Sequence, residues 1–261
     1  MRGRTNCLAT GSGTRAKFSF DGNNNSLSVK GRIVCEIQYA TAGYVSLYKD
    51  HEEMFLQLSP AFIHQQFVRN QVQTFQSWIE KAESMNGTLD RPSFKDSFFR
   101  TLNHAELVDP EAGRESFEAW LRCFSPITSQ HTTLNSDSNP NPTVRDQVTT
   151  QAEGEPAQEP DYNAMFDRIH ENREVEDLHW KIYHQCTKTR LFVTSGDLLG
   201  KGLKNIQEGD SVVLIAGVGM PMILRKDGNS YRSIGPAYID GMMNGEMWPE
   251  DEQDLIDIVL I

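Results

Sequence analysis

Hydrophobic and polar positions alternate with a period of two near the start of the chain. Phe18 and Phe20 fall on one face, and beyond a polar turn, DGNNNS, the alternation continues from Leu27 to Ile37. This period is typical of a half-buried antiparallel pair of strands. We therefore expect a β-hairpin region over residues 1–50, with a third short strand as an option.

From about residue 60 the period becomes that of a helix. Apolar positions recur at helical spacing from Phe62 to Ala82, and the pattern stops at the breaker NGT. Two shorter helices follow, one over SFKDSFFRTLNH with Ser93 as the predicted N-cap, and one over ESFEAWLRCF. Residues 51–125 are thus predicted to form a helical region, whose aromatic stripes are expected to be core rather than a binding face.

The middle of the chain divides into a polar segment and a second helical one. Residues 126–160 are dominated by serine, threonine, asparagine, proline and glutamate, and they cannot offset the entropy of being ordered. We expect a disordered insertion there. Helical spacing returns over residues 161–186, which predicts one amphipathic helix with a solvated charged face. Its histidines, His170, His179 and His184, are expected to be solvent-facing or partly buried rather than metal ligands.

The last part of the chain has the spacing of a small β unit. Four strand-like runs, RLFVT, SVVLIAG, PMILRK and YRSIGPAYIDG, are separated by the turns SGDLLGKG, EGD, GVG and DGNS. Closely spaced strands predict a small barrel over residues 187–248. Residues 249–261 are an acidic stretch with an apolar tip, which is either a final strand or a terminus that is cut or docked in a larger assembly.

These segments together predict an α+β fold. Its β part is a small antiparallel barrel or bent sheet that combines the C-terminal strands with the N-terminal hairpin. Four short strands bury little by themselves, so the hairpin is expected to pack onto them, with the helices covering one side.

The net charge and the cysteine content limit which classes of binding partner and which cellular compartment we expect. The 261-residue chain has a net charge of −11, with acids crowded into 153–177 and 246–257, so neither nucleic acid nor an anionic membrane is an expected partner. The cysteines, at positions 7, 35, 123 and 186, form no C-x-x-C pair and are expected to be reduced thiols. A soluble, cytoplasmic protein is the resulting expectation.

The glycine-rich stretch SGDLLGKGLKNIQEGD invites comparison with a phosphate-binding loop. The spacing from Gly196 to Gly200 is one residue short of a Walker A loop, and Gly202 stands where the Mg²⁺-binding hydroxyl is needed. The stretch also lacks a following helix to complete an anion site. We therefore predict a hairpin connection with glycines at positive φ, with Leu198 and Leu199 folded back onto the sheet and Lys201 an exposed charge.

No catalytic, cofactor-binding or metal-binding residue is predicted, and no cofactor is expected. The runner-up function is an enzyme that uses the 196–202 loop, or the group His179, His184 and Cys186, on a nucleotide or small substrate. A third option is a small-barrel scaffold that binds peptides through exposed strand edges.

An ordered series of motifs runs through the C-terminal part of the chain. It comprises a basic and an aromatic residue before Thr, a Gly-Leu-Gly type turn, a GD that opens a strand, a proline before an aliphatic LR, and a tyrosine strand that ends in G-x-x-x-GE. The positions that form it are Arg190, Phe192, Thr194, Gly200, Gly202, Gly209, Asp210, Pro221, Leu224, Arg225, Tyr231, Gly235, Tyr238, Gly241, Gly245 and Glu246. This series resembles the C-terminal region of fungal heterokaryon-incompatibility (HET) domain proteins.

Two upstream segments extend the resemblance to the same family. The stretch ATGSGTRAKFSFDGNNNSLSVKGRIVCEI is similar to the family's strand-turn-strand pair, and SFKDSFFRTL is similar to its F-x-R-T-L helix. Two departures stand out: Cys35 and Glu36 replace the usual acid of the first β segment, and Lys201 makes the turn more basic.

The resemblance implies a non-enzymatic regulatory or interaction module of a self/non-self recognition protein linked to programmed cell death. In that family the HET domain precedes this region and carries the cell-death activity, and no HET-domain sequence is visible before Arg15. The implied partner is accordingly a HET domain, in cis or in trans.

Overall fold

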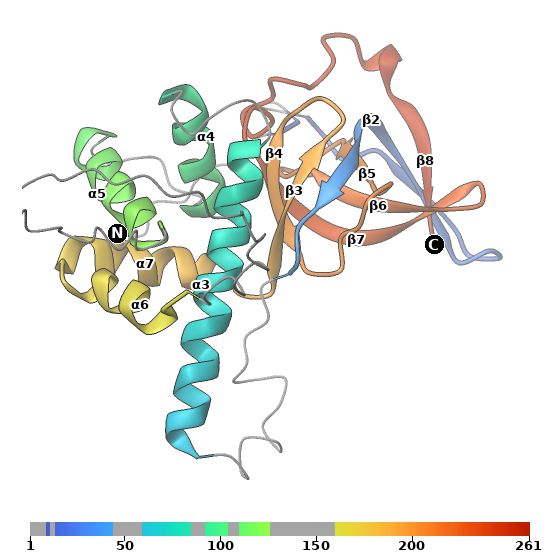
Figure 1. Ribbon diagram of the computed structural model, residues 1–261. Helices are drawn as coiled ribbons and strands as arrows, with labels where there is room; N and C mark the ends of the chain where they lie inside the picture. The colour runs from blue at the N-terminus through green and yellow to red at the C-terminus, as the bar shows by residue number, and fades with distance from the viewer. Residues whose placement is uncertain (1–8, 11–13, 44–58, 85–91, 104–109, 126–159) are drawn as a thin grey trace, which may run out of the picture.

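The computed structural model describes residues 9–10, 14–43, 59–84, 92–103, 110–125 and 160–261 (Figure 1). A group of helices lies on one side of the molecule and a ring of strands on the other, and the two are in contact. The predicted insertion at 126–160 falls outside the described residues apart from Pro160, and so do Cys7 and the predicted breaker at 86–88.

The strands form a mainly antiparallel sheet that closes on itself. Along the sheet they follow the order β1-β2-β3-β4-β7-β6-β5, and β2 also pairs with β5. A last strand, β8, pairs antiparallel with β2 and touches β7 in parallel. The strands are β1 Phe18–Asp21, β2 Ser26–Ala40, β3 Thr189–Thr194, β4 Leu199–Leu203, β5 Ser211–Ile215, β6 Met222–Asp227, β7 Ser230–Ile239 and β8 Ile256–Leu260.

The long strand β2 closes the ring. Its middle pairs with β5 and its last residues pair with β3, and the register shifts between Ile33 and Cys35 and again between Ile37 and Tyr39. Such irregularities bend a strand and increase its twist, which lets one strand serve two neighbours. The prediction of an α+β chain with a small antiparallel barrel or bent sheet is confirmed, as is the packing of the N-terminal hairpin onto the C-terminal strands.

Alternate residues of β3 belong to two different cores. Phe192 points into the barrel, where it packs in a buried cluster with Ile37 and Ile239. Its neighbours Leu191 and Val193 point the other way and join the core of the helices. This alternation is the period of two expected for a strand that is buried on both faces.

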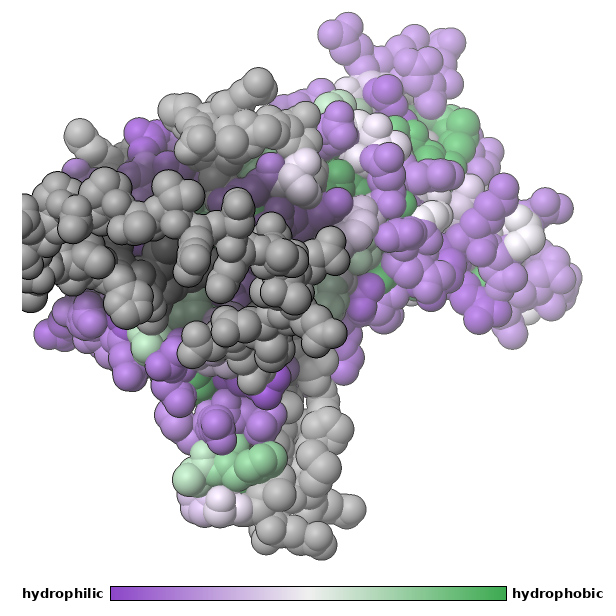
Figure 2. Space-filling view, in the orientation of Figure 1, coloured by the Kyte–Doolittle hydropathy of each residue, from purple (hydrophilic) through white to green (hydrophobic). Residues whose placement is uncertain are grey.

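The helices bury the aromatic stripes that the sequence predicted. Phe75, Trp78 and Trp120 are fully buried and pack in edge-to-face pairs. At the N-terminal end of α3, by contrast, Phe62 is 45% exposed, and Figure 2 shows hydrophobic surface there. The helices are α3 Pro60–Ser84, α4 Pro92–Asn103, α5 Pro110–Cys123, α6 Tyr162–His170 and α7 Arg173–Cys186.

Two predictions about these helices are wrong. Residues 161–186 form two helices instead of one, because Asn172 adopts an extended conformation and caps α7 by accepting hydrogen bonds from the backbone N–H groups of Glu174 and Val175. Ser93 is not an N-cap, because α4 already begins at Pro92, a residue suited to the first turn of a helix.

Three features of the β part also differ from expectation or go beyond it. The stretch read as a turn after β3 contains β4, which pairs with β3 and β7. Strand β1 is exposed along its whole length, so Phe18 and Phe20 share a face that is not buried. Of the two options for the acidic tail, the structure has the strand, β8.

None of the described helices is long and apolar enough to cross a membrane.

Candidate functional site at the junction of the helices and the barrel

Several of the family-like motif residues meet where the helices contact the barrel. We call this region the junction; it comprises α4, β4, the C-terminal end of α7 and the loop 240–246. Helix α4 contains the F-x-R-T-L motif and packs against β4, which contains Gly200 and Gly202. The loop that follows β7 contains the G-x-x-x-GE motif.

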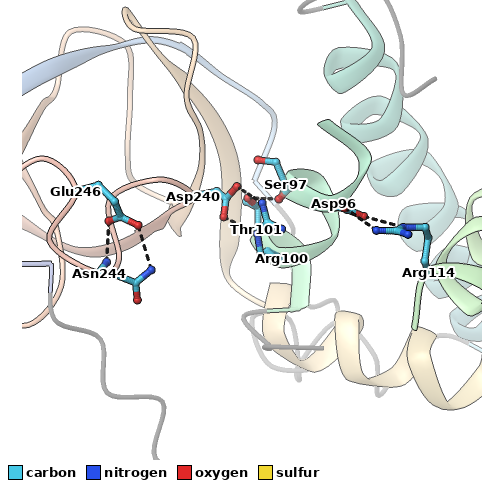
Figure 3. Close-up of polar contacts among 8 residues, drawn as sticks. All are labelled: Asp96, Ser97, Arg100, Thr101, Arg114, Asp240, Asn244 and Glu246. Atoms are coloured by element: carbon cyan, nitrogen blue, oxygen red, sulfur yellow. Dashed lines mark hydrogen bonds and ion pairs between the residues drawn. The ribbon is translucent and has the colours of Figure 1, made fainter. Parts of the chain in front are cut away.

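Helix α4 is attached to the barrel by a bidentate ion pair. Arg100 donates from Nε to Asp240 Oδ1 and from Nη2 to Asp240 Oδ2, both at 2.8 Å (Figure 3). The Asp240 side chain is 17% exposed and that of Arg100 is 39% exposed. Hydrogen bonding to Asp240 raises the pKa of the Arg100 guanidinium, against the opposing effect of burial. The two-point geometry fixes orientation as well as distance.

Helix α4 is attached to α5 by a second bidentate ion pair. Asp96 accepts from Arg114 Nε at 3.1 Å and from Arg114 Nη2 at 2.9 Å (Figure 3). Asp96 lies one turn before Arg100, so α4 carries one ion pair toward α5 and one toward the barrel. Within α4 the buried Thr101 hydroxyl donates to the Ser97 carbonyl at 2.8 Å. Helix α4 therefore connects the two parts of the molecule.

Lys201 is at the centre of the contact between α4 and β4. Its side chain is 1% exposed, and its Nζ donates to the Leu102 carbonyl in the last turn of α4 and lies 3.6 Å from Cys186 Sγ. Loss of solvent lowers the pKa of Lys201 and raises the pKa of the Cys186 thiol, and each group partly offsets the shift of the other. The prediction of an exposed charge is wrong, because α4 and α7 cover this face of β4.

The glycines on either side of Lys201 serve packing rather than turn geometry. Strands β3 and β4 pair antiparallel, so the predicted hairpin connection is present. Neither Gly200 nor Gly202 is among the described glycines with positive φ, so the predicted role of these glycines in the turn is wrong. A Cβ at Gly200 would lie 2.3 Å from the Phe192 ring, and one at Gly202 would lie 2.4 Å from Ile206 Cδ1. Both glycines therefore admit large interior side chains next to β4.

The GD and LR motifs form a second polar contact inside the barrel wall. The Asp210 side chain is 1% exposed, and it accepts from Arg225 Nε at 2.8 Å and from Arg225 Nη2 at 3.0 Å. Asp210 also accepts from the Gln207 backbone N–H, and Arg225 donates to the Asn205 carbonyl. Gly209 before the aspartate has a φ of +83°. The motif pair thus holds the connection from β4 to β5 against β6.

The G-x-x-x-GE motif forms a tight loop directly after β7. Gly241 and Gly245 adopt φ values of +86° and +87°, where L-residues are strained. Glu246 accepts from the Asn244 backbone N–H at 2.8 Å and from its side-chain amide at 3.0 Å (Figure 3). Between the glycines, Met242 is fully buried in the barrel cluster.

The histidines and cysteines do not assemble into a reactive group. His179 is fully buried; its Nδ1 accepts from Trp120 Nε1 at 3.2 Å, and its Nε2 lies 2.8 Å from Gln71 Oε1. Burial, with a smaller effect of His170, lowers the pKa of His179 to about 3. The expectation of a solvent-facing or partly buried ring is wrong for His179, whereas His184 is exposed.

The described residues contain free thiols but no cluster of metal-ligating groups. Cys35, Cys123 and Cys186 are the free thiols. Within these described ranges, no three His, Cys, Asp or Glu side chains lie close enough together to hold a metal ion.

The helical side also contains a hollow. A pocket of about 270 Å³ lies between α3, α4 and α5, and its lining residues include Gln76, Glu80 and Arg122. Two further lining residues, Lys95 and Glu118, form an ion pair at 2.8 Å, and the Lys95 hydrogen bond lowers the pKa of the Glu118 carboxyl. The lining includes no residue of the 196–202 stretch.

The fold and these contacts define a β-barrel module whose motif residues join it to a helical cover. Residues 121–259 match the Het-6 beta-barrel domain, and the chain belongs to this family of fungal heterokaryon-incompatibility proteins. The chain is 36% identical over 69 residues to "Heterokaryon incompatibility protein 6, OR allele" of Neurospora crassa. That match covers 25% of this chain and 10% of the relative. No solved structure matches the chain.

Proposed function

We propose that the chain is a non-enzymatic regulatory or interaction module of a fungal heterokaryon-incompatibility protein. The barrel and its helices act in the cytoplasm as one body, which packs against a HET domain, in cis or in trans, and restrains or positions it. Control of the HET domain's cell-death activity would follow from that contact, in line with the family resemblance.

The observation that carries this proposal is that polar residues in and beside the motifs are engaged in contacts within the fold. Lys201 is buried under α4, Arg100 holds Asp240, and Asp210 holds Arg225. A catalytic group must reach a substrate, whereas these side chains are used in contacts between elements of the fold. The first two contacts hold α4 on the barrel and the third holds the β4–β5 connection within it, which favours a structural and interaction role.

The same contacts weaken the runner-up enzyme hypothesis. In the 196–202 stretch the lysine is the group that would approach a phosphate, yet its Nζ donates a hydrogen bond to a helix carbonyl away from solvent. His179 and Cys186 are also fully buried. A thermal-shift screen with ATP, GTP, NAD and divalent metals tests this hypothesis, since a ligand present well above its Kd raises the melting temperature. We expect no shift, and a saturable rise would contradict the proposal.

Expression in a fungus tests the proposal in cells. Three strains are compared at matched protein levels: one with the chain alone, one with a HET domain alone, and one with the HET domain fused ahead of the chain. We expect the chain alone to leave viability unchanged and the fusion to differ from the HET domain alone. Cell death caused by the chain alone would refute the non-enzymatic role.

A further inference from the structure

The β1–β2 hairpin carries an exposed apolar face. Phe18 is 71% exposed and Phe20 is 67% exposed, and they lie opposite Val29 and Leu27 of β2. Residues that lie opposite each other in an antiparallel pair project to the same side. The apolar face of the hairpin is thus continuous with the buried cluster that contains Val29, but it extends beyond that cluster into solvent.

Strand β1 is also the terminal strand of the sheet path. It pairs with β2, and no other described strand pairs with its outer edge. In Figure 1 this hairpin is the blue loop that projects past the barrel beside the C-terminus. An exposed edge with aromatic side chains is a template for the addition of another strand.

The pairing with β2 determines which backbone groups face outward. Lys30 N–H donates to the Lys17 carbonyl, so residues 17, 19 and 21 direct their backbone groups toward β2. The N–H and C=O groups of Phe18 and Phe20 therefore point to the open edge. A partner strand would bond to these two residues.

The sequence of the edge, K-F-S-F-D from Lys17 to Asp21, is complementary to itself in an antiparallel arrangement. A twofold axis at Ser19 places Phe18 of one copy opposite Phe20 of the other, and these are the residues with outward-facing backbone groups. The same register places Lys17 opposite Asp21. The Asp21 carboxylate accepts hydrogen bonds from Asn23 and Asn24 in the turn, and the residue is exposed at the end of β1.

We propose that β1 is a self-association edge that pairs antiparallel with β1 of a second copy of this chain, in register about Ser19. The dimer would have aromatic pairs on one face and opposite charges on the other, and both kinds of cross-strand pair are stabilising. The contact is short, so the dimer is weak, with a Kd of roughly 10 μM to 1 mM. This proposal is independent of the proposed control of a HET domain.

Analytical ultracentrifugation of the full chain tests the association. Across protein concentrations spanning that Kd range, we expect the mass to rise from the monomer value of 29.6 kDa toward twice that value. The double variant Phe18→Ser/Phe20→Ser should remain monomeric. Phe62→Ser removes an exposed aromatic residue from α3 instead and should dimerise like the wild type.

Cysteine crosslinking tests the register. Ser19→Cys places two thiols opposite each other across the twofold axis, at a non-hydrogen-bonded pair with Cα atoms about 4.5 Å apart. The matched control, Asn24→Cys, puts a thiol at another exposed position, the hairpin tip. We expect a disulfide-linked dimer from Ser19→Cys at several times the rate of Asn24→Cys.

Three results would overturn the proposal. One is a chain that stays monomeric throughout the concentration range, as it would if the edge bound an extended segment of a different protein or of its own chain. Another is dimerisation that survives loss of both β1 phenylalanines. The third is equal crosslinking rates for the two cysteine variants.

Discussion

The buried histidine predicts an acid sensitivity whose size can be worked out. His179 is neutral in the folded protein, because its ring accepts from Trp120 and lies against Gln71 with no solvent contact. Its pKa is about 3 in the folded state and 6.5 as the ordinary value. Below pH 6.5 the His179 ring is protonated in the unfolded chain, whereas in the folded chain it stays neutral until the pH approaches 3. The free energy of unfolding therefore decreases as the pH falls from 6.5 toward 3.

The magnitude follows from linkage. For these pKa values, the free energy of unfolding drops by about 2 kcal/mol between pH 7.5 and pH 5.0 from His179 alone. Urea denaturation at both pH values measures the drop. His179→Gln removes the titration, and it should also lower stability at pH 7.5 by about 1–3 kcal/mol, because the Trp120 N–H loses its acceptor.

A control variant separates the contribution of His179 to the pH dependence of stability from that of the other titrating groups. His184→Gln removes an exposed histidine from the same helix and should keep the full pH dependence of the wild type. Both variants retain His170, which contributes to the lowered pKa of His179 and pairs with Glu176 at 2.9 Å. If His179→Gln loses as much stability between the two pH values as His184→Gln does, the assigned neutral, buried state of His179 is refuted.

Two further variants probe the motif residues. Gly200→Ala should lower the free energy of unfolding by about 1–3 kcal/mol through overpacking against the barrel core. Gly196→Ala should change it little, because an added Cβ would meet only Thr194 Oγ1, at 3.9 Å. Equal melting temperatures for the two variants would contradict the packing role of Gly200. Arg225→Ala should lower the free energy of unfolding by about 2–4 kcal/mol, because it leaves buried Asp210 without its cation. Arg232→Ala removes one partner of an exposed ion pair and should change the free energy of unfolding by no more than about 0.5 kcal/mol. Similar urea midpoints for the two variants would argue against a structural Asp210 contact.

Much of the fold could be predicted because it depends on local periodicity. The period of two marked β2, β3 and the C-terminal strands, and the helical period marked α3 to α5, since burial of one face requires such spacing. The break between α6 and α7 was missed because charged residues surround Asn172 and hide its capping role. Strand β4 was missed although Leu199, Lys201 and Leu203 alternate with glycines, because glycine and lysine are rare in buried strands.

The junction could be predicted only in part. The motifs are visible in the sequence, but Arg100 and Asp240 are 140 positions apart, and nothing local indicates that they meet. The burial of His179 did have a local signal, since it occupies the apolar stripe of α7 together with Val175 and Ile182. Lys201 had no such signal, because its burial depends on helices that come from other parts of the chain.

The central claim, that this chain is an interaction module for a HET domain, is tested most directly by binding. Isothermal titration of the purified full chain with a purified fungal HET domain measures it. We predict saturable binding that leaves both proteins folded and that requires no nucleotide or metal. Absence of binding at high micromolar concentrations, together with a fusion protein whose effect on viability equals that of the HET domain alone, would contradict the claim.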